Sequence, residues 1–578
     1  MTDQTPLDEK EILKGASPAR TAKALNATLK ALEDTCSTWN AQWKELRDYL
    51  APERGRFYTQ GDQINRGDQY DASAIVDNVG GKAVETLAAG MQSGLTSPAR
   101  PWFRLGLKDD VLEKLPEVKS WLHDVEKLLY AAFASSNFYA EAHSVYFEQA
   151  AFGTGCQLVE DDDQEDLRFL TLTIGEYAVS MDANGRPIQV GRRFYLTLEQ
   201  LNDHFGRDNL SPTLQAEVDK PEPAWQTFYQ VGHLVRKNSK YDPNKADIFS
   251  MRYESIYWEI GAPETQPPLR QSGYLEFPFM VPRWLIIGGN VYGHGPGHTN
   301  LPDVKMLQEM TADWLLAVHK TIDPPMRVPS NYNGTLDMLP GGLNQIDVND
   351  PAGVGALLDL RVDLNGIQLA LQEKKNDIRK GFFNDLFLML QDAPNDMTAT
   401  EVLERQSEKL LQLGPVLERQ QNDFHDPLID RVFGILYRRG KLPVPPPEIQ
   451  GAELRVEYIS LLALAQLRES LLAIQRATAY IKDVAQIAPT VLDKFNGDEA
   501  VDELQQVLGI SPAIIRTDEE VKKIRVARAQ KQALIEQQAQ TAQTAATAKT
   551  LSQTDLSGGN ALAEMMGAQN PVQGAAHA

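Results

Sequence analysis

Residues 281–303 read VPRWLIIGGNVYGHGPGHTNLPD, a segment rich in glycine and proline that leads directly into an amphipathic helix. We expect that helix over 303–322, with Asn300 as its N-cap and Pro302 close to its first turn. Its apolar side recurs at steps of three and four, the period of one helix face: Val304, Leu307, Thr311, Leu315, Val318 and Ile322. The prolines at 324 and 325 end it, because proline cannot continue the hydrogen-bond ladder.

A second helix is expected from about Leu364 to Leu390, after an insert rich in proline and glycine. Its main apolar face comprises Ile367, Leu371, Ile378, Phe382, Leu386 and Leu390. A polar loop, QDAPNDMT, follows at 391–398. Two long helices around a small non-helical tip, followed by a loop and a third long helix, do not form the pattern of a catalytic pocket. They indicate one wedge of a ring.

The third helix opens at Thr398, which stands three residues before Glu401 in the capping-box pattern. We expect Gly414-Pro415 and Pro427 to kink this helix without ending it. Two arginines and then Gly440 close it, with cations at the negative end of the helix dipole and glycine at the C′ position.

The composition is that of a soluble folded protein, and 578 residues predict three or four structural units. A net charge of −22 argues against a surface that adheres broadly to nucleic acid or to anionic membrane. The acidic, polar N-terminus is no secretory signal and no apolar run is long enough to span a bilayer, so we expect no membrane partner. Cys36 and Cys156 are expected to be buried free thiols.

Helical periodicity dominates 18–50, 72–93 and 118–153, whereas 157–279 alternates as strands do, with a turn at Asp182 to Gly185. The proline run at 443–447 precedes a further helical region. The expected fold class is mainly α with an inserted β-rich layer (α+β). Residues 1–17 are expected to be flexible and the Gln/Ala-rich residues 540–578 to be disordered.

Three features of the sequence are candidate metal-binding or catalytic sites. The acidic run EDDDQED at 160–166 could bind a divalent cation, but it lacks the spacing of a calcium loop, and a solvated hairpin end is the better interpretation. His294 and His298 could ligate zinc, but no third ligand follows at a recognisable spacing, so a tight connection into the next helix is favoured. Cys156 lacks a histidine placed by a motif to activate it. No enzyme, metal or cofactor emerges.

The second helix also carries a cationic cluster, Lys374, Lys375, Arg379 and Lys380. It could contact a phosphate backbone, or it could be an ordinary solvated helix face balanced by Glu373 and Asp377. The residues alone leave both interpretations open.

Four stretches carry a resemblance to a known family: LAAGMQSGLTSPARPWFRL at 87–105, PRWLIIGGNVYGHGPGHTNLPDVKMLQEM at 282–310, NDMTATEV at 395–402 and DPLIDRVFGILYRRGKLP at 426–443. In this order the chain resembles the head-to-tail connecting (portal) proteins of short-tailed, podovirus-like bacteriophages, over roughly residues 20–535. The resemblance implies a non-enzymatic ring, normally of twelve copies, at one capsid vertex. Double-stranded DNA would be packaged and ejected through it without sequence specificity.

The resemblance also implies a portal-type division of the chain: a wing at 18–300 with its β-rich insertion, stem helices at 301–322 and 353–390, a clip at 323–352, a channel loop at 391–398, a kinked wing helix at 399–442 and a helical crown at 443–539. A stem helix that packs against two neighbours needs more than one apolar face, and Phe383 and Phe387 beside the main face of the second helix would supply the other.

The implied channel residues are Lys374, Lys375, Arg379 and Lys380 on the stem and Asp392, Asn395, Asp396 and Met397 in the loop. The implied clip residues that dock the packaging motor and the adaptor are Arg327, Asn331, Tyr332, Asn333, Leu336 and Asp337. The implied partners are further copies of the chain, the terminase large subunit, the tail adaptor, and the major capsid and scaffolding proteins. The implied location is the virion, and the host cytoplasm during assembly.

Two alternatives remain at this level. One is a metal-dependent hydrolase that uses His294, His298 and acids of the 160–166 run. The other is a helical scaffold with no viral role.

Overall fold

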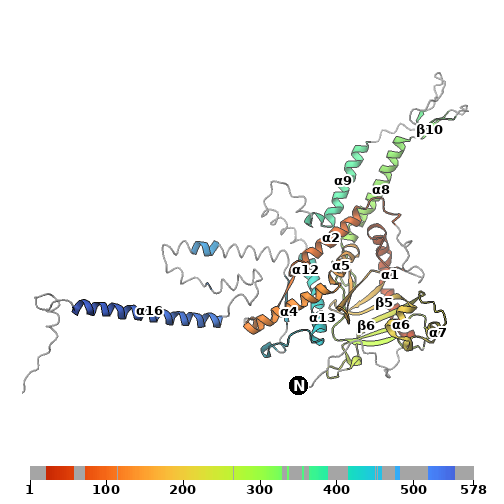
Figure 1. Ribbon diagram of the computed structural model, residues 1–578. Helices are drawn as coiled ribbons and strands as arrows, with labels where there is room; N and C mark the ends of the chain where they lie inside the picture. The colour runs from red at the N-terminus through yellow and green to blue at the C-terminus, as the bar shows by residue number, and fades with distance from the viewer. Residues whose placement is uncertain are drawn as a thin grey trace, which may run out of the picture. The chain divides into compact units, whose positions relative to one another are not determined.

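The computed structural model describes residues 21–57, 72–113, 115–245, 247–264, 266–323, 325–328, 335–337, 355–356, 363–387, 414–449, 451, 454–458, 476–481, 497 and 518–552. Contacts divide the chain into two units, Met1–Asn496 and Gly497–Ala578. Helices and antiparallel sheets both contribute to the first unit, so the α+β expectation is confirmed at that level (Figure 1).

The N-terminal helical part of the first unit comprises α1 (Ala22–Leu50), α2 (Val79–Leu95), α4 (Pro116–Ser135) and α5 (Phe138–Phe152), with the short α3 (Asp110–Glu113) before α4. Helical periodicity was expected over 18–50, and α1 buries Leu25, Leu29 and Leu32 because leucines at helical spacing share one face. The helical region expected over 118–153 forms two helices, α4 and α5, which meet at Ser136 and Asn137. Helix α5 is buried along most of its length and ends at Gly153, whose φ of 78° is the left-handed cap favoured by glycine.

Two sheets form the β-rich insertion, as expected for 157–279. The three-stranded sheet has the order β3-β2-β9, from Asp166–Leu172, Cys156–Asp162 and Phe279–Met280. The five-stranded sheet has the order β4-β5-β6-β7-β8, from Tyr177–Met181, Pro187–Thr197, Phe228–Lys237, Tyr253–Glu259 and Arg270–Tyr274. The expected turn after β4 is present: Asp182 Oδ1 accepts hydrogen bonds from the backbone N–H groups of Asn184 and Arg186, and Gly185 has φ 77°.

Helices cover the five-stranded sheet. Helix α1 lies against it at Gly191, where a Cβ would come within 2.8 Å of the Leu29 side chain, so the absent side chain allows the close approach. A second apolar cluster joins the sheet to α6 (Leu198–Phe205) and α7 (Pro212–Val218). Thr197 and Gln200 form a reciprocal capping box at the start of α6. Short 3-10 turns at Arg207–Asn209, Ile248–Ser250 and Pro447–Ile449 complete the connections.

One strand corrects the assignment of 443–539 to a purely helical crown. Residues Leu454–Tyr458 form β12, which pairs antiparallel with β1 (Phe103–Leu107) from the other end of the chain. The Tyr458 side chain also binds Asp426, so this segment contacts the region expected to be the third long helix. The sequence signal for this strand was the alternation of apolar residues at Leu454, Val456 and Tyr458. The run is short, however, and no turn residues mark it as part of a hairpin.

The third long helix is irregular where the structure describes it. Residues 399–413 and the Thr398 capping box lie outside the described residues. From Gly414 the chain forms α12 (Gly414–Gln420), a π-helical turn (Gln421–His425) and α13 (Asp426–Arg438). The end of α13 matches the predicted glycine cap. Gly440 N–H donates to Tyr437 O and Lys441 N–H donates to Leu436 O, which is the Schellman arrangement, and Gly440 has φ 67°.

The second unit contains α16 (Asp518–Ser552). The expectation of disorder from residue 540 is therefore wrong for 540–552, which continue the helix. Alanine and glutamine are good helix formers, and their run extends it without an apolar face.

Candidate functional site: the paired helices and their base

Helices α8 (Pro296–Ile322) and α9 (Leu364–Gly381) lie side by side and carry β10 (Met326–Arg327) at their outer end, as Figure 1 shows. Strand β10 pairs antiparallel with β11 (Gly355–Ala356). Residues 355–356 therefore belong to the tip, although the sequence-based boundary placed them in the second helix segment. The helix–tip–helix order expected from the sequence is present in the described residues.

The start of α8 differs from the prediction. Gly295 is the N-cap and Pro296 the first helical residue, so Pro302 lies inside the helix. Asn300 is not the cap: it is buried, and its Nδ2 donates a 2.8 Å hydrogen bond to Pro296 O. The Asn-Leu-Pro sequence looked like a start signal, but Pro296 is also suited to an N1 position and begins the helix earlier.

The α8 side chains near the base are buried, whereas the outer half exposes large apolar groups. Leu301, Val304 and Leu307 are at most 6% exposed. Exposed apolar residues on α8 are Met306, Leu315, Leu316 and Ile322. At roughly 100° per residue, Leu316 lies about 120° around the helix from Val304, so it belongs to another face. The described residues of this chain leave that face uncovered.

The four candidate cations of α9 divide into two pairs. Lys374 forms ion pairs with Asp303 at 3.2 Å and Asp377 at 3.7 Å, and Lys375 forms one with Asp77 at 2.6 Å. These lysines flank the buried Leu371–Ile378 stripe, which is why they meet acids of the same chain. Salt bridging raises the pKa of Lys374, first through the hydrogen bond to Asp303.

Arg379 and Lys380, by contrast, are exposed. Arg379 donates to the side chain of Asn376. The exposed side of α9 is otherwise mainly polar, with Gln372, Glu373 and Asn376. The structure thus separates the cluster that the sequence placed together: two lysines position the helix, and two cations face outward.

The base of the two helices is an elbow. The helix expected to reach Leu390 stops at Gly381, and Phe383 takes the left-handed conformation with φ 57°. Phe387 lies over Gly90 of α2, where a Cβ would be 2.2 Å from the ring. Phe382 and Leu386 are buried, and Phe383 packs beside Trp284. Phe383 and Phe387 therefore do not form a second face available to a neighbour, which corrects that expectation.

A glutamine on α8 holds the segment that precedes α2. Gln308 Oε1 accepts hydrogen bonds from the backbone N–H groups of Val76 and Asp77, both 2.8 Å, and its Nε2 donates to Asp77 O. Asp77 in turn pairs with Lys375 of α9. Sequence reasoning missed Gln308, because a glutamine on a helix stripe carries no local signal for so distant a partner.

Several expected contact residues can be located only in part. In the tip, Arg327 and Asp337 are exposed and Leu336 is half-buried. Asn331, Tyr332 and Asn333 lie outside the described residues. The loop residues Asp392, Asn395, Asp396 and Met397 also lie outside them.

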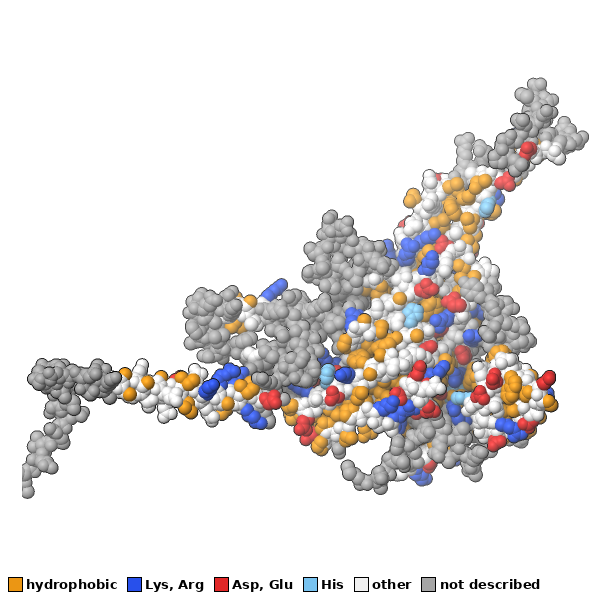
Figure 2. Space-filling view, viewed as in Figure 1, with side chains coloured by type: hydrophobic (Ala, Val, Ile, Leu, Met, Phe, Trp, Pro, Cys, Tyr) orange, Lys and Arg blue, Asp and Glu red, His pale blue; other side chains and the backbone are white. Residues whose placement is uncertain are grey.

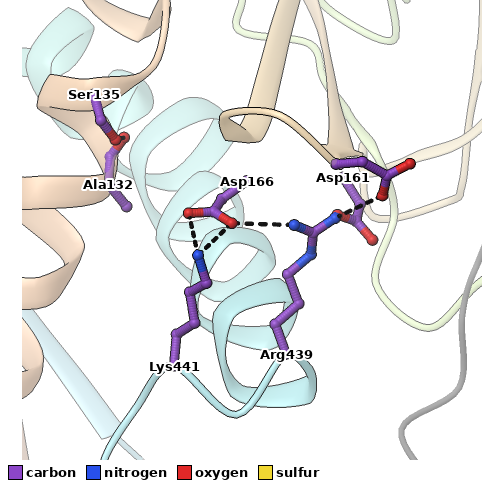
Figure 3. A network of polar contacts seen from close by, with 7 residues as sticks. Ala132, Ser135, Asp161, Asp166, Arg439 and Lys441 are labelled. Atoms are coloured by element: carbon purple, nitrogen blue, oxygen red, sulfur yellow. Dashed lines mark hydrogen bonds and ion pairs between the residues drawn. The ribbon is translucent and has the colours of Figure 1, made fainter.

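The acidic hairpin end at 160–166 is not simply solvated. Figure 3 shows Arg439 and Lys441 at the end of α13 directed at Asp161 and Asp166 of the β2–β3 hairpin. Arg439 is 3.1 Å from Asp166 and 3.4 Å from Asp163, and Lys441 is 2.6 Å from Asp166. Arg439 and Lys441 therefore attach the third helix to the β2–β3 hairpin. The hairpin acids form ion pairs with side chains of the same chain.

Glu276 makes a second attachment to the same helix. It pairs with Arg431 at 3.0 Å and with Arg438 at 2.7 Å. Burial would raise the pKa of Glu276, but the two guanidinium groups outweigh it and hold the pKa below its usual value. Gly434 lets the carboxylate approach, since a Cβ there would be 2.5 Å from Glu276 Oε1.

The histidines of the 281–303 segment pack as part of the core. The ring of His294 lies 5.2 Å from Trp39 and 4.9 Å from His298. His298 Nδ1 accepts a hydrogen bond from Gly295 N–H, and burial lowers the pKa of His298 to about 4. Within the described ranges no three His, Cys, Asp or Glu side chains converge as metal ligands. Nothing therefore supports the hydrolase alternative.

Both cysteines are buried free thiols, as predicted. Cys36 Sγ lies 2.7 Å from Tyr292 Oη, and burial raises the pKa of both cysteines. Among the helices of the described residues, none has the length and apolar character needed to cross a membrane.

Comparison with known proteins agrees with this geometry. The chain is 40% identical over 531 residues to the probable portal protein of Bordetella phage BPP-1, covering 91% of this chain and 95% of that protein. It is 34% identical over 549 residues to the portal protein of Salmonella phage epsilon15, covering 94% and 98%. A chain from the virion of a native gene transfer agent particle aligns at TM-score 0.34 and 13% identity, covering 69% of this chain and 86% of that one, too low a similarity to inform on the fold.

The family model described as bacteriophage head to tail connecting protein matches residues 22–515. That span includes α8, α9 and the attachments of α13, and it covers most of the chain. The chain therefore belongs to the bacteriophage head-to-tail connecting proteins, and its function is that of a viral portal.

Proposed function

We propose that copies of this chain close into a ring, of twelve subunits as the family resemblance implies, around a channel for double-stranded DNA at one vertex of the capsid. Helices α8 and α9 form the stem of each subunit. The ring assembles in the host cytoplasm and remains in the virion, where the genome enters and leaves through it.

The apolar face at Met306 and Leu316 is the observation that carries this proposal. Both residues are about half exposed, at 48% and 51%, on a helix whose inner stripe residues, Val304 and Leu307, already pack within its own chain. Exposed apolar surface of this kind on a projecting helix favours a protein partner. An identical wedge rotated about an axis would cover it, and such a heterologous contact closes into a ring.

The polar side of α9 fits the opposite role. In the proposed ring it faces the channel, so that Arg379 and Lys380 contact phosphates without reading sequence. Lys374 and Lys375 fix the helix in place through their ion pairs. The loop 391–398, with Asp392, Asn395, Asp396 and Met397, lies next in the chain and would meet the duplex.

The tip that contains β10 and β11 is proposed to dock other components. Arg327, Leu336 and Asp337 would contact the terminase large subunit during packaging and the tail adaptor afterwards, together with Asn331, Tyr332 and Asn333. The wing would contact the major capsid and scaffolding proteins.

A single charge placed on the apolar face tests the ring. Leu316→Glu should leave each chain folded but abolish rings, because a buried carboxylate at the interface has no partner. Val444→Glu is the matched control, since Val444 is an exposed aliphatic residue at 82% that lies outside the paired helices. Native mass spectrometry and negative-stain microscopy would report the assembly. Rings of unchanged abundance from Leu316→Glu together with Met306→Glu would overturn the proposal.

The channel assignment has a separate test. Deletion of Asp392 to Met397 should leave ring assembly intact and impair DNA packaging or retention. Loss of the ring on that deletion would mean that this loop is misplaced in the proposed ring.

A further inference from the structure

Helix α16 carries an unusual concentration of positive charge. Five cations lie between 521 and 535, all of them exposed, and no aspartate or glutamate occurs in that span, although three acids at 518–520 precede it. Arg525 already makes an interaction within the chain. The remaining four are Lys522, Lys523, Arg528 and Lys531. Figure 2 shows these Lys and Arg side chains gathered on one part of α16, whereas the rest of the helix lacks such a cluster. The whole chain has a net charge of −22, so this segment opposes the general charge of the protein.

The cations surround the helix. At roughly 100° per residue, Lys522, Lys523, Arg528 and Lys531 point in widely separated directions about the axis. The apolar residues are scattered too: Ile524, Val526, Leu534 and Ile535 are 36–58% exposed and form no continuous stripe. A helix that binds at a lipid surface has one apolar face and one basic face, and α16 has neither.

This arrangement suits an anion that is present on more than one side. We propose that the 522–531 segment of α16 binds the phosphate backbones of double-stranded DNA without sequence preference, as a contact separate from the stem. The segment spans about 14 Å at 1.5 Å per residue, and over that length a duplex presents about eight phosphate charges. Four cations can therefore each find a phosphate on one duplex or on neighbouring ones.

The proposal extends the proposed function, since a portal meets DNA, but it does not depend on the stem lining a channel. If each of the four cations replaces a counterion, log K should fall with log salt at a slope of about −3.6, because each phosphate contact contributes about −0.9. Affinity due to this segment should then drop about 150-fold between 50 and 200 mM salt.

Binding of a fluorescent 30-base-pair duplex to the full-length protein, followed by anisotropy at both salt concentrations, tests the proposal. The variant Lys522→Gln, Lys523→Gln, Arg528→Gln, Lys531→Gln should lose most of this binding and its salt dependence, while circular dichroism shows the helix retained, since glutamine is a good helix former. The matched control replaces the three lysines by arginine and should bind as the unmodified protein does. A second duplex of unrelated sequence should bind equally.

The paired-helix variant Arg379→Gln, Lys380→Gln separates the two DNA contacts. If it alone abolishes binding, the duplex is held by the stem and the α16 proposal is overturned. Binding by the four-fold glutamine variant with an unchanged salt slope overturns it as well. Preference of the unmodified protein for phosphatidylglycerol vesicles over duplex at equal salt would identify a membrane as the partner and also reject it. Failure of the Leu316→Glu ring test, by contrast, would leave duplex binding by α16 unaffected.

Discussion

Replacing Gly381 by alanine should force apart helices α8 and α9. A Cβ at this position would lie 1.8 Å from Asn300 Oδ1 and 2.6 Å from its Cγ. Asn300 cannot simply rotate away, because it is buried and its Nδ2 donates to Pro296 O at 2.8 Å. The glycine of α9 is therefore the surface against which the Asn300 side chain of α8 packs.

The expected magnitude follows from three terms. Overpacking a filled site costs about 1–3 kcal/mol, and displacing Asn300 forfeits a hydrogen bond worth about 1 kcal/mol. Replacing a helical glycine by alanine stabilises a helix by about 1 kcal/mol, which opposes these costs. Gly381→Ala should consequently lower the free energy of unfolding by about 1–3 kcal/mol. Adding Asn300→Ala removes the clash, so the two substitutions should be coupled by at least about 1 kcal/mol.

Urea denaturation of the full-length variants, followed by circular dichroism, measures this coupling. Gly289→Ala is the control, because a Cβ at Gly289 meets nothing within 4 Å and its backbone is not left-handed, so this substitution should be neutral or slightly stabilising. If Gly381→Ala proves as stable as the unmodified chain, or if its cost is the same with and without Asn300, then this contact does not set the spacing of the helices.

Three further predictions test contacts within the first unit. Burial raises the pKa of Glu148 to about 7. The folded chain therefore binds this proton more tightly than the unfolded chain does, and the free energy of unfolding should fall as pH rises from about 4.5 to about 7. Glu148→Gln should reduce this fall in a plot of stability against pH. Arg439→Ala should cost about 2 kcal/mol, because hydrogen bonds to charged groups contribute about 1.5–3 kcal/mol. The cost should be lower at high salt and should exceed that of Lys441→Ala, whose side chain is more exposed, as urea titrations at two salt concentrations would show. Gly90→Ala should lower the thermal midpoint by displacing Phe387, and Phe387→Leu should restore part of the loss, whereas equal midpoints would contradict the contact.

Elements whose burial follows from the hydrophobic periodicity of their own residues were predictable from the sequence. The α1 stripe of Leu25, Leu29 and Leu32 is buried because residues three and four apart share a face whatever they pack against. The β-rich insertion was recognisable for the same reason, since alternation reports on a half-buried strand directly. The Gly440 cap was predictable because it depends only on the backbone conformation of one residue.

The elbow after α9 could not be predicted, because the local signal and the tertiary packing disagree. Ile378, Phe382 and Leu386 continue one helical stripe through the break, so periodicity alone indicates a single helix. The structure places Phe383 at φ 57° instead, a conformation that costs on the order of 1–2 kcal/mol for a bulky residue. Burial of Phe382, Leu386 and the packing of Phe387 on Gly90 offset it, and those partners are distant in sequence.

The cations and acids illustrate the same limit. Lys374 and Arg379 look alike in a sequence, yet one is fixed by Asp303, 71 positions away, and the other faces outward. The acids of the 160–166 run pair with Arg439, which lies more than 270 positions later in the chain. Ion pairing over such separations is decided by topology, so charge patterning could locate the candidates but could not divide them into positioning residues and available ones.

These contacts together imply that α8 and α9 cannot move independently of α2. Gln308 of α8 holds the backbone at Asp77, Asp77 holds Lys375 of α9, and Phe387 after α9 rests on Gly90 of α2. Each contact links a stem helix to α2 or to the segment that leads into it. A displacement of α2 must therefore carry both helices with it, or break a buried hydrogen bond, an ion pair and an aromatic contact at once.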